Sequence, residues 1–137
     1  MEVEFVIPGE PVGKQRPKAS FQMRKIYTPK ETVNYESFVK HCYYGNPHFC
    51  ERQVGVNMKV YLPIPSSTSK KKQQQMLDKI IRPCKKPDLD NVIKSVLDGL
   101  NGVAYEDDKQ VVELHAEKYY DLTPRVEVKL WSISLAD

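Results

Sequence analysis

The sequence of 137 residues lacks a long apolar run, which removes several classes of protein from consideration. No stretch approaches the roughly 18 to 20 apolar residues that a membrane-spanning helix needs. The first ten residues carry acids where a signal peptide carries basic residues, so we expect a cytoplasmic protein. Cysteine is scarce and odd in number, at three, which argues against a disulfide framework. Repeats, low-complexity segments and linkers are also absent, so residues 1–137 are expected to form a single domain.

The charges divide unevenly along the chain. Residues 1–87 hold sixteen Lys and Arg against seven Asp and Glu, a net charge of +9, whereas residues 88–137 hold five against eleven, a net charge of −6. A basic surface attracts a polyanion such as nucleic acid. An acidic cluster inside that field would repel phosphate unless it bound a cation. This combination suits a metal-dependent nuclease, although a chance division of solvated charges is the simpler alternative.

Apolar periodicity predicts the secondary structure. Alternating residues indicate strands at 3–7 and 54–62, and two further strands at 111–120 and 125–135 that we expect to form an antiparallel hairpin. Helices are predicted at 29–44, 69–81 and 89–101, and residues 10–30 are expected to be an irregular basic loop. The order β-α-β-α-α-β-β predicts an α+β fold with helices packed on a mixed sheet.

The segment 86–91, KPDLDN, places two carboxylates at the start of the third predicted helix. A carboxylate before a helix commonly caps the first turn, so Asp88 or Asp90 is a candidate N-cap. A metal site is the second interpretation, because Lys94 follows one turn after Asp90 and further acids occur at 106–108. Mg²⁺ favours carboxylate oxygens, and a lysine stabilises negative charge that develops on a phosphate.

Other acidic and metal-binding motifs fit less well. An EF-hand that began at Asp88 would need Gly and Glu where the chain has Ile93 and Gly99. A phosphatase DxD motif follows a buried apolar strand, whereas lysines precede Asp88. The His and Cys residues between 41 and 50 match no common zinc spacing.

The segment KPDLDNVIKSVLDGLNGVAYEDDKQV resembles the core of the RusA family of Holliday junction resolvases, which occur in bacteria and their prophages. A PDxDN-like turn, a lysine on the next helix, an LD-x-L segment and a DD-x-Q-V stretch appear in the family's order. The resemblance implies a RusA-like, dimeric, Mg²⁺-dependent endonuclease, with Mn²⁺ as a substitute ion, that cuts four-way DNA junctions by paired symmetric nicks. A two-fold enzyme matches a two-fold junction.

By motif position, the resemblance implies that Asp88, Asp90 and Asp108 bind the metal and that Lys94 is catalytic. Asp107 matches the first position of the DD pair. Glu106 stands where other members carry an apolar residue, so the acid used in this loop stays open among the three.

Basic residues close to aromatic ones suit contacts with phosphates and bases. This pattern predicts DNA binding by the loop with Lys14, Arg16 and Lys18, which also holds Phe21, Arg24, Lys25 and Tyr27, and by Lys85 and Lys86 beside the acidic turn. For Lys70, Lys71 and Lys72 a solvated helix end is as good an explanation. Two alternatives to the resolvase stay open: a nucleic-acid-binding module without catalysis, and a nuclease for flaps or hybrids.

Overall fold

The computed structural model describes residues 1–20, 22, 25–27 and 29–135, without the side chains of residues 25 and 27. The main sheet contains four strands: β1 (Glu2–Pro8), β4 (Gln53–Pro63), β5 (Val111–Asp121) and β6 (Arg125–Ile133). The helices are α1 (Lys30–Tyr43), α2 (Lys70–Leu77), α3 (Leu89–Leu100) and a short 3-10 helix, η1 (Asp108–Gln110). Two short strands, β2 (Lys18–Ser20) and β3 (Lys25–Tyr27), pair with each other. None of the helices that the structure describes is long and apolar enough to cross a membrane.

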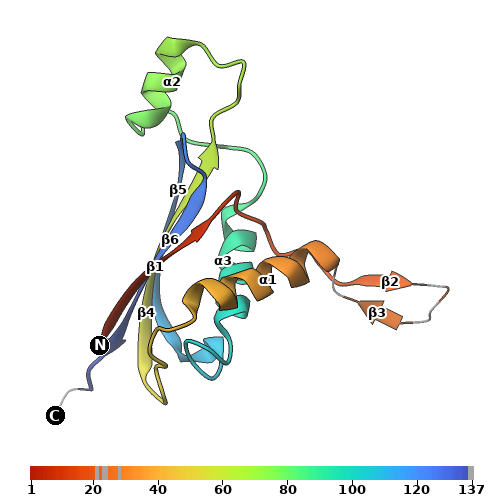
Figure 1. Cartoon of the computed structure of the whole chain (residues 1–137), viewed down its shortest axis with the longest axis vertical. Coiled ribbons are helices and arrows are strands. Elements are labelled where there is room, and N and C mark those ends of the chain that lie inside the picture. Colours follow the sequence, from red (N-terminus) through yellow and green to blue (C-terminus); the bar gives the residue numbers. More distant parts are fainter. Residues whose placement is uncertain (21, 23–24, 28, 136–137) are drawn as a thin grey trace.

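The main sheet is mixed, in the order β1-β6-β4-β5. β6 pairs antiparallel with both β1 and β4, and β4 pairs in parallel with β5. Helices α1 and α3 pack together against the sheet, α2 lies beyond one end of it, and β2 and β3 project from the body (Figure 1). This arrangement confirms the predicted α+β fold with a mixed sheet and helices packed on it.

The predicted C-terminal hairpin is wrong. β5 and β6 are joined by residues 122–124, but β4 lies between them in the sheet. The burial of the strands gives the reason. Most residues of β4 are buried, including Val56, Met58 and Val60, whereas Val112 and Leu114 of β5 are exposed. A strand whose residues are mostly buried belongs in the interior of a sheet, and a strand with few buried residues lies at its edge.

Two other expectations need correction. Residues 10–30 are not wholly irregular, because the β2–β3 ribbon lies within them. The helix predicted at 69–81 ends at Leu77, since Asp78 is its C-cap and Lys79 has a positive φ of 65° that stops it. Ser69 caps its other end by accepting a hydrogen bond from the Lys72 amide, as a serine before a helix often does.

Helix α3 places the acidic turn against the core. Its buried side chains include Val92, Val96 and Leu100, which form the apolar stripe seen in the sequence. Leu89, between the two aspartates, also packs against the core. One face of α3 is therefore fixed by apolar packing, and the face with Asp90, Lys94 and Asp98 remains accessible to polar groups.

Helices α1 and α3 approach each other closely at Gly99. A Cβ atom at this position would lie 2.8 Å from the Cβ of Val39 and 3.1 Å from the carbonyl oxygen of Glu36. Beside this contact, the Lys40 Nζ donates to the carbonyl oxygens of Gly99, at 2.7 Å, and Asn101, at 3.1 Å. A cation from α1 thus satisfies the free carbonyls at the C-terminus of α3, where the helix dipole favours positive charge.

Gly99→Ala is expected to lower the free energy of unfolding by about 1 to 3 kcal/mol, the usual effect of overpacking. Helix propensity alone would predict a gain of roughly 0.5 to 1 kcal/mol, so the sign separates the two effects. Urea denaturation measures the change. Val39→Gly removes the Cβ atom that the new methyl group would meet, so the same substitution should be less harmful in that background. An equal loss in both backgrounds would contradict the proposed steric cause.

Candidate active site

The basic loop after β1 is fixed directly against the start of α3. The Lys14 amide donates to the Asn91 carbonyl oxygen at 2.7 Å, and the buried Ser95 hydroxyl donates to the Val12 carbonyl oxygen at 2.6 Å. A Cβ on Gly13 would lie 3.1 Å from the Asn91 Cβ and 3.2 Å from the Pro87 Cβ. Glycine therefore allows the two chain segments to approach closely, and the basic loop lies beside the acidic turn.

Asp88 and Asp90 both carry free, exposed carboxylates at the start of α3. Asp88 is the N-cap by position, with extended backbone angles, but its side chain makes no capping hydrogen bond. Asp90 lies in the first helical turn. Among the described residues neither carboxylate has a hydrogen bond or an ion pair. Capping alone therefore does not explain the acidic pair, and both side chains are available to a ligand near the positive end of the helix dipole.

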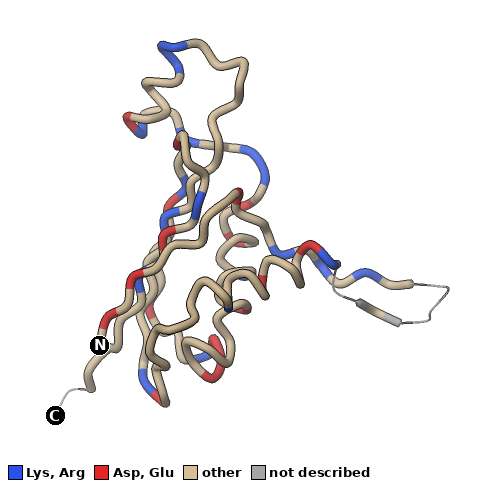
Figure 2. The backbone as a smooth tube through the Cα atoms, viewed as in Figure 1, with Lys and Arg blue, Asp and Glu red and all other residues tan. Residues whose placement is uncertain are grey.

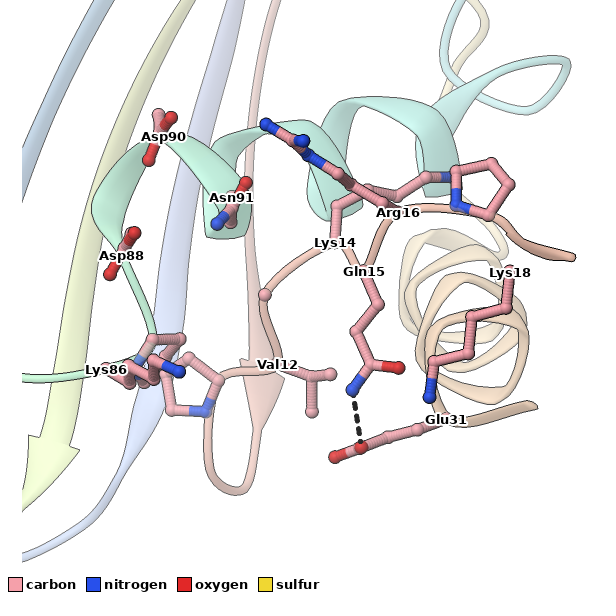
Figure 3. Close-up of a pocket in the computed structure, with 14 residues that line it drawn as sticks. Val12, Lys14, Gln15, Arg16, Lys18, Glu31, Lys86, Asp88, Asp90 and Asn91 are labelled. Carbon is pink, nitrogen blue, oxygen red and sulfur yellow. Dashed lines mark hydrogen bonds between the residues drawn. The ribbon is translucent and has the colours of Figure 1, made fainter. Parts of the chain in front are cut away.

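These two aspartates line an open pocket of about 790 Å³. Its opposite wall comes from the basic loop, with Lys14, Gln15, Arg16 and Lys18 (Figure 3). Lys86 and Asn91 complete the side near the acidic turn, and Gln15 is held by a hydrogen bond to Glu31 at 3.2 Å. The pocket thus presents acids at one helix end and cations opposite them, which suits a ligand with both a metal ion and phosphate groups.

A chain of alternating charges runs along the polar face of α3. The Lys14 Nζ contacts Glu36 at 2.6 Å and Asp98 at 3.2 Å. The Lys94 Nζ contacts the same Asp98 at 3.2 Å and Asp108 at 3.5 Å. Asp98 therefore joins the basic loop to Lys94, and Lys94 in turn joins α3 to the acidic loop at Asp108.

These ion pairs keep both lysines charged. The hydrogen bond to Asp98 is the main cause of a raised Lys94 pKa, and Asp108 adds a smaller electrostatic contribution. Partial burial opposes the charge of Lys14, but its contacts with Glu36 and Asp98 outweigh burial and raise its pKa. At neutral pH each lysine is a cation, able to donate hydrogen bonds but not to act as a base.

The acidic loop directs its three carboxylates to different partners. Asp107 caps η1 by accepting from the Lys109 amide, Glu106 faces the thiol of Cys50, and Asp108 faces Lys94. Gln110 holds the loop in place. Its side-chain oxygen accepts from the Glu106 amide at 2.8 Å, and its side-chain nitrogen donates to the carbonyl oxygens of residues 49 and 52, at 2.9 and 3.1 Å. In the part of the chain that the structure describes, Asp108 is the one acid of the three that forms an ion pair with α3.

The chain matches the family model described as endodeoxyribonuclease RusA over residues 8–131. It belongs to the RusA endodeoxyribonuclease family. It is also 36% identical over 140 residues to an uncharacterized protein, YqaN, of Bacillus subtilis strain 168, with 96% of this chain and 97% of that protein covered. Membership of the RusA family implies an endodeoxyribonuclease that binds branched DNA and acts on Holliday junctions.

Two of the carboxylates fit a metal ion. Mg²⁺ is usually bound by one or two protein carboxylates and keeps several waters for substrate phosphates, so unpaired Asp88 and Asp90 suit it. Within the described ranges no three Asp, Glu, His or Cys side chains converge to hold an ion, the region 41–50 included. The structure thus brings Asp108 back to α3, as the sequence suggested, but beside Lys94. Its role as a third metal ligand in this RusA family member stays a prediction.

The predicted DNA-binding residues separate into two groups. Arg16, Lys18 and Lys86 are exposed and line the pocket, and Lys85 is exposed next to them with its ammonium group over the Tyr120 ring. Lys14 instead contacts two carboxylates and helps to hold the loop on α3. Phe21 and Arg24, and the side chains of Lys25 and Tyr27, lie outside the described residues, so their predicted DNA contacts stay predictions.

Three residues that matter for the geometry carried no site prediction: Glu36, Asp98 and Gln110. Asp98 and Gln110 do fall within the LD-x-L and DD-x-Q-V segments. Asp98 also follows Lys94 by four residues, a helical spacing that predicts the ion pair between them. Nothing local indicates Glu36, because its partner Lys14 is 22 residues away.

Replacing Asp98 by Asn should lower the Lys94 pKa more than replacing Asp108 by Asn, because the Asp98 hydrogen bond is the largest cause of the raised value. NMR titration of labelled lysine side chains in metal-free protein measures both changes. Glu4→Gln is the matched control, since Glu4 lies on β1 and contacts Lys129. A larger fall in the Asp108→Asn protein would contradict the assignment.

Proposed function

We propose that the protein is a magnesium-dependent endonuclease that resolves four-way DNA junctions in recombination and repair by paired, symmetric cleavage of phosphodiester bonds. This proposal rests on the acidic pair Asp88 and Asp90, which has no ion pair among the described residues and lines one wall of a pocket whose other wall is basic. Carboxylates on a DNA-binding surface repel the phosphates of DNA unless a metal ion lies between the two groups.

In this proposal Asp88 and Asp90 hold Mg²⁺, which Mn²⁺ can replace, and Asp108 supplies a third carboxylate if the loop and α3 approach further on DNA binding. When bound, the ion polarises the phosphate and lowers the pKa of a water molecule. Asp107 stays a structural cap of the same loop. We choose Asp108 over Glu106 as the third ligand because of where the two side chains point. The Asp108 carboxylate faces Lys94 on α3, whereas the Glu106 carboxylate faces Cys50.

Lys94 is assigned the stabilisation of negative charge on the phosphate or the leaving oxygen. Its raised pKa supports this role, because the side chain stays protonated while Asp98 orients it. Arg16, Lys18, Lys85 and Lys86 bind the DNA backbone around the pocket. Two copies of the chain would place one such site on each of the two strands to be cut, so we propose a homodimer. The family's occurrence in prophages supports the same origin for this chain.

Asp88→Asn and Asp90→Asn should each abolish Mg²⁺-dependent nicking of a synthetic four-way junction, because the ion loses a charged ligand. Binding to the junction should be retained. Cleavage is followed on labelled strands and binding by gel shift without metal. Glu4→Gln, which makes the same chemical change on β1, should cut as the unmodified protein does.

The substrate panel separates the alternatives. Four-way junction, flap, linear duplex and RNA–DNA hybrid are compared under one set of conditions, with Mg²⁺ and then with Mn²⁺. Preferential cleavage of flaps or hybrids would replace the resolvase by another branched-substrate nuclease. Binding without cleavage of any substrate would sink the proposed catalysis and leave a binding module.

Lys94→Met should slow cleavage by about 10²- to 10³-fold, the usual effect of removing one group that stabilises charge in a transition state. Single-turnover rates at saturating enzyme measure this loss apart from binding, which should change little. Lys94→Arg restores the charge but not the compact ammonium group, so it should recover part of the rate. A loss of affinity with an unchanged single-turnover rate would instead assign Lys94 to DNA binding.

A further inference from the structure

Helix α2 begins with three consecutive exposed lysines: Lys70, Lys71 and Lys72. Their ammonium groups have no ion pair among the described residues, and the first turn contains no acid. Cations at a helix N-terminus oppose the helix dipole and so destabilise the helix. The lysines therefore do not stabilise the helix that carries them, and a partner outside the chain is the better explanation of their position.

The base of α2 is held on the edge strand β5. Met76 is buried, and the cations of Lys79 and Arg82 lie 4.7 and 4.5 Å from the centre of the Tyr119 ring. The Arg82 Nε also donates to the Lys118 carbonyl oxygen at 3.0 Å. These contacts hold the C-terminal end of α2, and Ser69 caps its exposed lysine-bearing end, so a ligand would bind a helix that is already formed.

Basic residues continue from α2 to the candidate active site. The segment that returns from α2 to the start of α3 is basic (Figure 2) and holds Arg82, Lys85 and Lys86. Lys86 lines the pocket with Asp88 (Figure 3). Arg16 and Lys18 lie on the other side of the same pocket (Figure 3), and Lys18 begins β2 of the projecting ribbon (Figure 1). The acidic turn therefore lies between two basic elements that leave the body in different directions.

We propose that α2 binds the phosphate backbone of a second duplex arm of a branched DNA, while Arg16 and Lys18 bind the arm beside the scissile phosphate. This inference rests on the proposed function and adds a basis for structure selectivity. A linear duplex bound at the pocket reaches one basic element, whereas DNA arms that diverge at a branch reach both. The protein would distinguish branched from linear DNA by the positions of the phosphates. No base contact is needed, and the distinction would not depend on sequence, because phosphate contacts carry no sequence information.

Salt dependence provides a quantitative test. Each phosphate contact by a lysine contributes about −0.9 to the slope of log K against log salt concentration. The triple variant Lys70→Gln/Lys71→Gln/Lys72→Gln should make the slope for a four-way junction shallower by about 2 to 3 for each protomer bound. The slope for a linear duplex of the same arm sequence should stay unchanged. Fluorescence anisotropy in EDTA measures both, since the DNA remains uncut without metal.

The matched control is Lys59→Gln/Lys129→Gln, which removes lysines from the sheet face lined by Glu4 and Glu127. In this control, the slope of log K against log salt concentration for the four-way junction should change little per lysine removed. Glutamine is a good helix former, and removal of the lysines relieves the dipole, so the triple variant should unfold at the same or a higher temperature.

The outcomes separate this inference from the function on which it rests. A shallower slope for the junction alone supports the role of α2. An unchanged junction slope, or equal changes for junction and duplex, overturns it even if the protein still cuts junctions. If the unmodified protein neither prefers nor cuts junctions, the proposed function fails first.

Discussion

The close contact between α1 and α3 at Gly99 is the constraint on which the site depends. It allows the Lys40 side chain of α1 to reach the last carbonyls of α3, and it brings Glu36 of α1 within reach of Lys14. With its apolar face on the sheet and its C-terminus held by α1, α3 presents one polar face in a defined direction. The orientation of α3 also fixes the orientation of the acidic turn, because this turn is the first turn of the same helix.

The distribution of charges around the site follows from the fixed orientation of α3. Acids and bases alternate along α3 from Glu36 through Lys14, Asp98 and Lys94 to Asp108, so most charges near the helix are paired. Asp88 and Asp90 are outside that chain of pairs. Surface ion pairs contribute little stability individually, at about 0 to 1 kcal/mol. Their effect here is on the orientation of the side chains and on the protonation of Lys14 and Lys94, whose pKa values they raise.

Local patterns predicted the elements better than their pairing. The alternation in β4 and the apolar stripe of α3 indicated both elements nearly to their ends. The short segment between β5 and β6 favoured a hairpin, yet β4 occupies the position between them. Strand order depends on how far each strand is buried relative to the others, and that is a comparison between distant segments. The β2–β3 ribbon escaped detection because three-residue strands are too short for a period to appear.

The sequence by itself determined the family, the fold class and the acidic turn, because these depend on residue types at short, fixed spacings. Tertiary structure decided which charges remain free. Lys14 appeared equivalent to Arg16 and Lys18 along the chain, but folding places two carboxylates beside it and leaves the other two exposed. The three acids at 106–108 were likewise indistinguishable until the loop turned one of them toward Lys94. Both distinctions arise from contacts between residues far apart in sequence, and no local spacing encodes them.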